Sequence, residues 1–156
     1  MKKILLSLIL FFILTISNSY AQNTKAFILS EGGGTPGSGK LSSYTFSGNS
    51  FSNSITSPGN LGLYPDGIAK YNSNLFVLEQ GGFGGQGKIY RMDSTGLILN
   101  SQAFGTNPYS IAIANNKIYA TNGPGSKVTV LNITSLSTIK EIPVGVYPQE
   151  ILGFQN

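Results

Sequence analysis

Short apolar or alternating runs, each followed by a turn-forming segment, succeed one another along most of this chain. Between residues 65 and 107 there are four such runs, at residues 65–69, 75–78, 88–92 and 97–104. Residues 75–78 are wholly apolar and residues 88–92 alternate, as expected of a buried and a half-buried strand respectively. The Gly-rich segment 79–87 and the turn 93–96 separate them. The pattern predicts four successive β-strands joined by tight turns.

The same order of runs recurs in the next segment of the chain. Its runs comprise residues 108–114, 118–121, 127–131 and 138–144. The last run carries Lys140, Glu141 and Pro143. An outer edge strand tolerates charges and a proline, because its outward N–H groups need no partner. We therefore expect residues 138–144 to form an exposed edge strand.

A Pro-x-x-Ile element marks the start of each repeat. It occurs at Pro65–Ile68, Pro108–Ile111 and Pro148–Ile151, at intervals of 43 and 40 residues. A fixed period of about 40–45 residues built from short strands is typical of a β-propeller blade. The sequence therefore predicts an all-β propeller of four-stranded blades.

The repeats are offset from the ends of the chain. Runs at 26–29, 40–46 and 51–56 match the second, third and fourth strands of a blade, whereas residues 148–154 match a first strand. In a closed propeller this offset lets the last inner strand complete the first blade. The expected blades are residues 26–64, 65–107 and 108–147, with a further blade starting at 148–156.

About three blades are fewer than the four or more of known propellers. We interpret residues 22–156 as an incomplete part of a larger ring, in a truncated chain or gene fragment. The alternative is that three blades close by themselves. On the first interpretation, missing blades or self-association are needed to cover apolar surface at the two open ends.

The N-terminal residues have the pattern of an export signal. Lys2 and Lys3 precede an apolar stretch over residues 4–16, and Ser19–Ala21 ends in small residues. This order predicts a signal peptide of residues 1–21, cleaved before Gln22. A membrane anchor is the alternative, but the apolar stretch is short of the ~20 residues that span a bilayer. We expect the protein in the periplasm, at the cell surface or outside the cell, with no transmembrane segment after cleavage.

The amino-acid composition excludes several kinds of catalytic site, metal site and partner. The chain has no Cys and no His, which removes lipoprotein attachment, disulfides, a Ser-His-Asp triad and a His- or Cys-ligated zinc. After cleavage, eight Lys and Arg against six Asp and Glu give a net charge of +2. No basic cluster with interleaved aromatics is present, so we expect no nucleic-acid partner.

One repeat resembles a known family. Tyr119–Asn122 resembles the Tyr-Val-Thr-Asn motif of the YVTN-type β-propeller repeats, and Val128–Asn132 with Ile142–Pro148 resembles the remainder of that repeat. The family often has Asp at the position of Asn132. The match is strong over residues 107–148 and looser elsewhere. The resemblance implies an exported seven- or eight-bladed propeller, usually with a binding role and no shared catalytic residues.

Propeller topology places the second-to-third-strand loops and the connectors between blades on one face. The loops are 31–39, 79–87 and 122–126, and the connectors are 58–66, 105–109 and 145–149. Aromatic side chains near a few carboxylates form a plausible ligand platform there. The candidate ligand-binding residues are Phe83, Glu31, Glu79, Tyr64, Tyr109, Tyr147 and Asn122.

Structural roles compete with binding at several of these positions. The three tyrosines flank the repeated prolines, and repeated positions commonly serve packing between blades. Glu31 and Glu79 stand at equivalent positions before their loops, where a carboxylate can accept hydrogen bonds from loop N–H groups. Phe83 has no aromatic equivalent in the other two loops, which favours contact with a partner.

Three functions are consistent with these observations. We favour a non-enzymatic propeller that binds a protein or small ligand on its loop face, without a cofactor. The first alternative is a metal-dependent hydrolase of the lactonase kind, with Asp66, Glu150 and Asn122 around a cation such as calcium. The second is a structural surface-layer or adhesive protein, suggested by the low charge and the abundance of Gly, Ser and Asn.

The signal-peptide assignment makes a direct prediction. Replacing Leu8 and Leu10 with charged residues breaks the apolar stretch that the export machinery recognises. We expect the precursor to accumulate in the cytoplasm, as measured by cell fractionation. Unchanged secretion of the double variant would show that these residues are not an export signal.

Overall fold

The computed structural model describes residues 25–46, 50–52, 55 and 61–153. The predicted signal peptide lies outside these residues. The described strands are β1 (Lys25–Ser30), β2 (Lys40–Thr45), β3 (Ser50–Ser52), β4 (Pro65–Tyr71), β5 (Asn74–Glu79), β6 (Gly87–Met92), β7 (Ile98–Phe104), β8 (Pro108–Ala114), β9 (Lys117–Asn122), β10 (Lys127–Asn132) and β11 (Thr138–Pro143). No helix occurs among the described residues.

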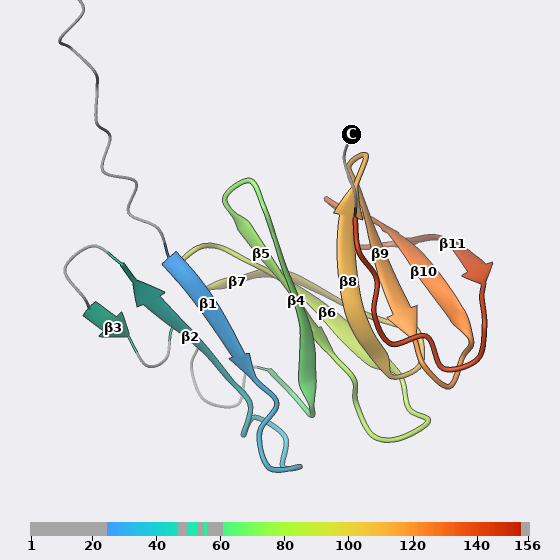
Figure 1. The fold of residues 1–156 in the computed structure, drawn as a ribbon, viewed down its shortest axis with the longest axis horizontal. Helices are drawn as coiled ribbons and strands as arrows, with labels where there is room; N and C mark the ends of the chain where they lie inside the picture. Colours follow the sequence, from blue (N-terminus) through green and yellow to red (C-terminus); the bar gives the residue numbers. More distant parts are fainter. Residues whose placement is uncertain (1–24, 47–49, 53–54, 56–60, 154–156) are drawn as a thin grey trace, which may run out of the picture.

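The strands form three antiparallel sheets that stand side by side (Figure 1). Along the chain, the first sheet is β1-β2-β3, the second is β4-β5-β6-β7 and the third is β8-β9-β10-β11, with the strands of each in sequence order. Each four-stranded sheet is the up-and-down meander of a propeller blade. The sequence-based prediction of a partial β-propeller is confirmed, including the exposed edge strand β11 with its charges and Pro143.

Two predicted strands differ from the structure. Residues 148–153 form no strand, although a first strand was predicted over 148–154. A blade's first strand is held by its second, as β4 is by β5, and no described strand plays that part for residues 148–153. The predicted strand 51–56 is described only in part: β3 ends at Ser52, and residues 53–54 and 56 lie outside the described residues.

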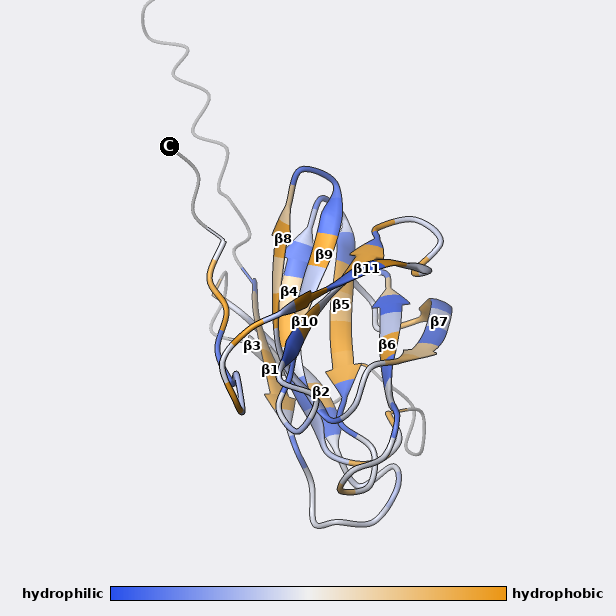
Figure 2. Ribbon diagram, turned by 90° about the vertical axis from the view of Figure 1, so that its right-hand side faces the viewer, coloured by the Kyte–Doolittle hydropathy of each residue, from blue (hydrophilic) through white to orange (hydrophobic). Residues whose placement is uncertain are grey.

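The cores lie between neighbouring sheets. One cluster joins the second and third sheets and includes Phe76, Leu78, Ile118 and Leu131, all buried. The other joins the first two sheets and includes Leu41, Leu75, Val77 and Met92, with Phe27 and Leu29 packed against it. Figure 2 shows β5, a strand that contributes to both cores, in the hydrophobic colours over most of its length. A strand buried on both faces reads as a continuous apolar run, as residues 75–78 do.

The repeated proline packs on a glycine of the preceding sheet. A Cβ added to Gly39 would lie 2.3 Å from Pro65 Cγ, and one added to Gly87 would lie 2.3 Å from Pro108 Cδ. Each glycine directly precedes a lysine of a blade's third strand, Lys40 of β2 or Lys88 of β6. The Pro-x-x-Ile element therefore recurs because each copy makes the same contact between neighbouring sheets. That contact leaves no room for a side chain in place of the glycine.

This contact predicts the effect of two matched glycine substitutions. Gly87→Ala forces a methyl group onto Pro108 and should destabilise the fold by about 1–3 kcal/mol, the usual cost of overpacking. Gly82→Ala in the adjoining loop has nothing within 4 Å of the new Cβ and should change stability little. Thermal and urea unfolding of the two variants would compare them. Equal stabilities of the two variants would mean that the sheets make room for the methyl group without a loss of folding free energy.

Candidate functional site

The loops predicted to share a face do lie together, at the bottom of Figure 1. Hydrogen bonds tie these loops to the connectors between blades. Gly37 N–H donates to Gly62 O (2.6 Å), Gln80 N–H to Tyr64 O (2.9 Å) and Asn107 N–H to Gly85 O (3.1 Å). The loop face is thus a connected backbone network, and a change in one loop reaches its neighbour.

Two polar residues at the end of second strands hold the connectors between blades. Leu63 N–H donates to Glu79 Oε1 (3.1 Å), and Thr106 N–H donates to Asn122 Oδ1 (3.0 Å). Leu63 and Thr106 each stand two residues before a repeated proline. The backbone N–H two residues before the proline therefore donates the same hydrogen bond in two successive blades.

We call each of these hydrogen-bonded arrangements a clamp, and each clamp also includes a hydroxyl group on the third strand of the blade. Tyr90 OH donates to Glu79 Oε2 (2.6 Å), and Asn122 Nδ2 donates to Thr129 Oγ1 (2.9 Å). Asn122 is fully buried, and its amide is occupied by contacts within the chain. Burial, reinforced by Glu79, raises the pKa of Tyr90, so the phenol stays a donor. Glu79 and Asn122, predicted as ligand-binding residues, therefore serve the fold in this structure.

The predicted equivalence of Glu31 and Glu79 is wrong. Glu79 pairs with Lys88 and Asn122 with Lys127, but Lys40 pairs with Ser30. Ser30 is therefore the counterpart of Glu79, and Glu31 lies one position further along. A shift of one residue turns a side chain to the other face of a strand. Glu31 is accordingly exposed and lies on the loop face.

A hollow of about 190 Å³ opens on the loop face between the first two sheets. It is lined by Glu31, Tyr64, Gln80, Gly81, Phe83 and Asn107. Three of these, Glu31, Tyr64 and Phe83, are residues that the sequence singled out. Phe83 is 87% exposed, the most exposed large apolar side chain of the described part. Gln80, Gly81 and Asn107 were missed, because nothing in their local sequence separates them from ordinary loop residues.

Asn107 organises the Gly-rich loop beside this hollow. Its Oδ1 accepts from Gly84 N–H (2.6 Å), and its Nδ2 donates to Gln80 O (3.1 Å) and Gly82 O (2.9 Å). Its side chain is buried. A buried amide that satisfies three loop groups fixes the loop that carries Phe83. The Gly-rich loop 79–87 is therefore held in place from the next blade.

The residue before each repeated proline adopts a left-handed backbone. Tyr64 (φ 53°), Asn107 (φ 40°) and Tyr147 (φ 51°) share this conformation. It costs roughly 1–2 kcal/mol for an ordinary residue, and Asn tolerates it best. With this backbone conformation, the side chains of Tyr64 and Asn107 line the hollow. Tyr147 is exposed and does not line it.

The three tyrosines have different surroundings. The hydroxyl of Tyr64 lies so close to Gly34 that a Cβ there would come within 2.8 Å. The ring of Tyr109 covers Gly123 in the same way, at 2.5 Å. Tyr147 is 58% exposed. Packing against the neighbouring blade, the role considered for these residues, is thus seen at Tyr64, which lines the hollow as well, whereas the ring of Tyr109 packs within its own blade.

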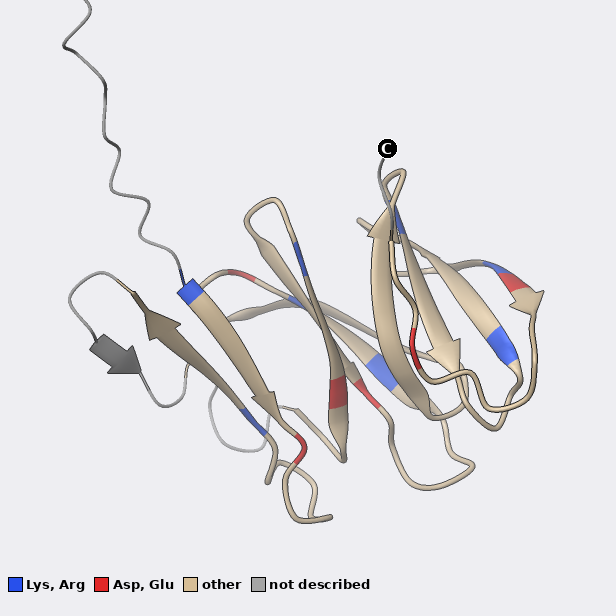
Figure 3. Ribbon diagram, viewed as in Figure 1, with Lys and Arg blue, Asp and Glu red and all other residues tan. Residues whose placement is uncertain are grey.

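The two carboxylates considered for a metal site, Asp66 and Glu150, accept hydrogen bonds from different side chains. Asp66 Oδ2 accepts from Gln80 Nε2 (2.9 Å), and Glu150 Oε2 accepts from Ser110 Oγ (3.0 Å). No group of three acidic side chains close enough to hold a metal occurs among the described residues. In Figure 3 red segments follow β1, begin β4 and stand beside β8, all toward the loop face.

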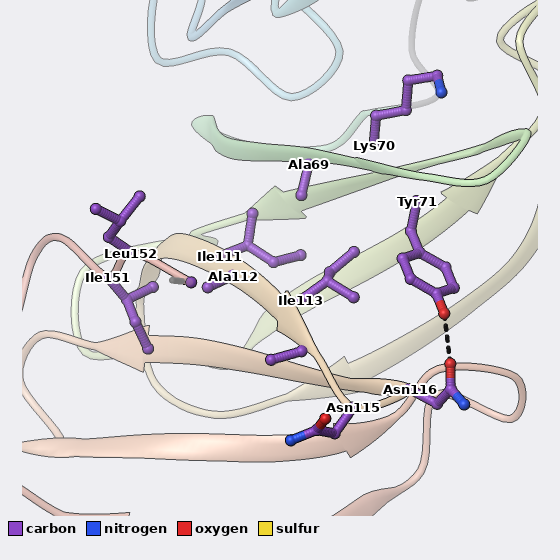
Figure 4. Close-up of a pocket in the computed structure, with 12 residues that line it drawn as sticks. Ala69, Lys70, Tyr71, Ile111, Ala112, Ile113, Asn115, Asn116, Ile151 and Leu152 are labelled. Carbon is purple, nitrogen blue, oxygen red and sulfur yellow. Dashed lines mark hydrogen bonds between the residues drawn. The ribbon is translucent and has the colours of Figure 1, made fainter. Parts of the chain in front are cut away.

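A second cavity, of about 360 Å³, lies between the first strands of two blades. It is lined by residues 69–71 of β4, residues 111–116 in and after β8, and residues 151–153. Figure 4 shows apolar side chains such as Ile111, Ile113 and Leu152 around it, with the Tyr71 hydroxyl donating to Asn116 Oδ1 at one end. It carries neither carboxylate nor exposed aromatic, so the loop-face hollow is the better candidate site.

The surroundings of Asp66 predict that replacing it changes stability in a pH-dependent way. Partial burial raises the pKa of Asp66 above its ordinary value of 3.8, the nearby Glu31 and Glu150 raise it further, and the Gln80 hydrogen bond opposes them. Ionised Asp66 therefore destabilises the folded state near neutral pH, and this penalty disappears as the pH falls through the raised pKa. Asp66→Asn should raise the melting temperature at neutral pH and have no effect well below pH 3.8.

A matched control is Glu141→Gln, which removes an exposed carboxylate paired with Lys127 at 2.7 Å. This substitution should give no gain in stability at neutral pH. Differential scanning calorimetry over a pH series would compare the two variants. A gain for Asp66→Asn that persists at low pH would show a cause other than charge.

No family model and no curated protein matches this chain. Its fold is similar to solved structures that include a candidate 6-phosphogluconolactonase from Bacteroides fragilis, with a TM-score of 0.56 and 14% identity over 80% of this chain and 38% of that chain. Apo AztD from Citrobacter koseri matches with a TM-score of 0.52 and 23% identity over 76% and 35% of the two chains.

A protein of unknown function from Bacteroides caccae matches with a TM-score of 0.50 and 10% identity, over 80% of this chain and 49% of that one. This chain thus spans between a third and a half of the length of these structures. No helix in the described part of the chain could cross a bilayer. At such identities the likeness concerns the fold alone, and the chain shares the fold of propeller-like proteins.

Proposed function

We propose that this protein is an exported propeller of the YVTN type that binds a small ligand or a protein side chain in the loop-face hollow. One observation carries the proposal: an exposed aromatic, Phe83, stands at the edge of a hollow that also holds Tyr64 and Glu31. Exposed aromatics beside a pocket are the usual anchors of recognition, because they supply contact area at a small entropic cost.

The loop is prepared for binding by the fold. Asn107 satisfies three backbone groups of the loop that carries Phe83, so the loop is ordered before a partner arrives. A preorganised loop loses less conformational entropy on binding. Because its ring is exposed, Phe83 adds little to the hydrophobic core, and binding gives a reason for its ordered position.

The lining indicates the chemistry of the ligand. The hollow has one carboxylate, Glu31, two aromatic rings and the Gln80 amide, and no Lys or Arg lines it. A positively charged or donor-rich group would meet the carboxylate and the ring faces together. At about 190 Å³ the hollow accommodates one such group rather than a large cofactor.

The hydrolase alternative rests on weaker support. Asn122 is buried and occupied by contacts within the chain, which leaves Asp66 and Glu150 as its candidate residues. The name of the Bacteroides fragilis protein mentions a lactonase, but that likeness concerns the fold alone. A calcium titration with a lactone-hydrolysis assay separates the alternatives: saturable, metal-dependent hydrolysis by this chain would contradict binding as its sole function. A surface-layer or adhesive role has no structural observation in its favour.

The binding proposal predicts the effect of Phe83→Ala. Fluorescence anisotropy with labelled, acetylated peptides carrying a central Lys, Arg or Glu would identify a peptide bound by the unsubstituted protein. We expect a Lys or Arg peptide to bind and Phe83→Ala to weaken it by roughly 1–3 kcal/mol, the range of an aromatic anchor. The melting temperature should stay almost unchanged, since Phe83 is 87% exposed.

Leu97→Ala is the matched control, because Leu97 is also a large exposed apolar residue (62%) but lies beside the outer strand β7. It should change neither binding nor stability. A large loss of stability in Phe83→Ala would mark the ring as structural. Unchanged affinity of every bound peptide would remove this loop from the site.

A further inference from the structure

Strand β7 forms the outer edge of the second sheet, and its composition differs from that of the corresponding strand in the third sheet. It pairs with β6, and no described strand pairs with its other edge. Figure 2 shows β7 at the rim of the molecule, outside β6. Residues 97–104 contain neither a charged residue nor a proline. Strand β11, the outer strand of the third sheet, carries Lys140, Glu141 and Pro143.

An unprotected edge of this kind is a template for pairing with a strand of another molecule. Charges and proline are common protections of an edge strand, and β11 has both. Short segments without charge or proline are also those that stack most readily into intermolecular sheets. Leu97 and Leu99 are 62% and 48% exposed, so a strand laid beside β7 would gain apolar contacts as well. The edge of β7 therefore favours pairing unless its backbone groups are already engaged.

Two side chains of β7 engage backbone groups of the strand itself. Asn100 Oδ1 accepts from Ser101 N–H (2.8 Å), and Gln102 Nε2 donates to Ala103 O (3.1 Å). Ser101 and Ala103 stand two positions apart, so their backbone groups point to the same side of the strand. Because these groups bond to side chains of β7, that side is the one that faces away from β6. A strand added to this edge would need the same two groups.

The third sheet holds the Asn100 amide in this position. Asn100 Nδ2 donates to Ser135 O (3.4 Å), and Arg91 Nη1 on β6 donates to Thr134 O (2.8 Å). Both carbonyl groups belong to the turn between β10 and β11. With its nitrogen directed to that turn, the amide keeps its oxygen on the Ser101 N–H. Packing between two blades thus supports the hydrogen bond at the edge of one of them.

We propose that Asn100 and Gln102 shield the edge of β7 against pairing with a strand of another molecule. An incoming strand must displace both side-chain amides before its own backbone can bond to Ser101 and Ala103. Exchanging one hydrogen bond for another gains little free energy, so the occupied edge no longer favours pairing. None of these four residues lines the loop-face hollow, and the inference does not rest on the proposed ligand.

The experiment measures the capture of a free strand by the edge. The probe is a fluorescently labelled peptide with the sequence of residues 97–104, extended by one glutamate at each end so that it carries no cation for the hollow. Fluorescence anisotropy would compare its binding to the unsubstituted chain and to the double variant Asn100→Ala/Gln102→Ala. We expect the double variant to bind the peptide at least about tenfold more tightly, because two freed backbone groups each gain a hydrogen bond.

The matched control adds Ser101→Pro to the double variant. Proline removes the outward N–H, and edge strands tolerate it at such a position, so the peptide should no longer be captured. Circular dichroism would check that each variant retains its sheets. Should the double variant unfold, Gln102→Ala alone takes its place, because Gln102 is exposed, and tighter binding is again expected. Affinity equal to that of the unsubstituted chain, or capture that survives Ser101→Pro, would overturn the proposal.

Discussion

The fold depends on one clamp that is repeated at the end of the second strand in both four-stranded blades. Glu79 and Asn122 differ in charge, yet each accepts a hydrogen bond from the backbone N–H two residues before a repeated proline. Each is completed by a hydroxyl on the third strand. The clamp fixes where a chain leaving one blade enters the next, and the proline then seats on a glycine of the preceding sheet. An unsatisfied buried N–H would cost about 1–3 kcal/mol, so the clamp constrains the sequence strongly.

The candidate site is a by-product of these connectors. The residue after the clamped N–H has a left-handed backbone in two blades, at Tyr64 and Asn107. Both side chains line the same hollow from adjacent connectors. One supplies an aromatic wall, and the other orders the loop that carries Phe83. Variation at a structurally repeated position thus produces a surface that exists only once among the described sheets, as binding sites on repeat scaffolds commonly do.

Much of the fold was predictable because strand periodicity and turn residues are local signals. The strands between residues 65 and 143 agree with the runs in the sequence to within two residues at every end. The strand predicted at 148–154 failed because pairing needs a partner, and a repeat motif cannot show whether one is present. The equivalence of Glu31 and Glu79 failed because loops of similar composition conceal a shift of one residue, and only the pairing of Ser30 with Lys40 reveals it.

By itself the sequence determined the all-β propeller, the order of strands, the common face of the loops and three residues of the candidate site, since each follows from period, composition or connectivity. Only the tertiary structure decided which polar residues are consumed by the fold. Asn122 and Glu79 have the chemistry of ligand-binding groups, but their hydrogen-bond partners come from connectors 16 residues away along the chain. Asn107 reaches the preceding blade from 23 to 27 residues away. Such long-range contacts leave no local pattern, because they depend on how the sheets pack.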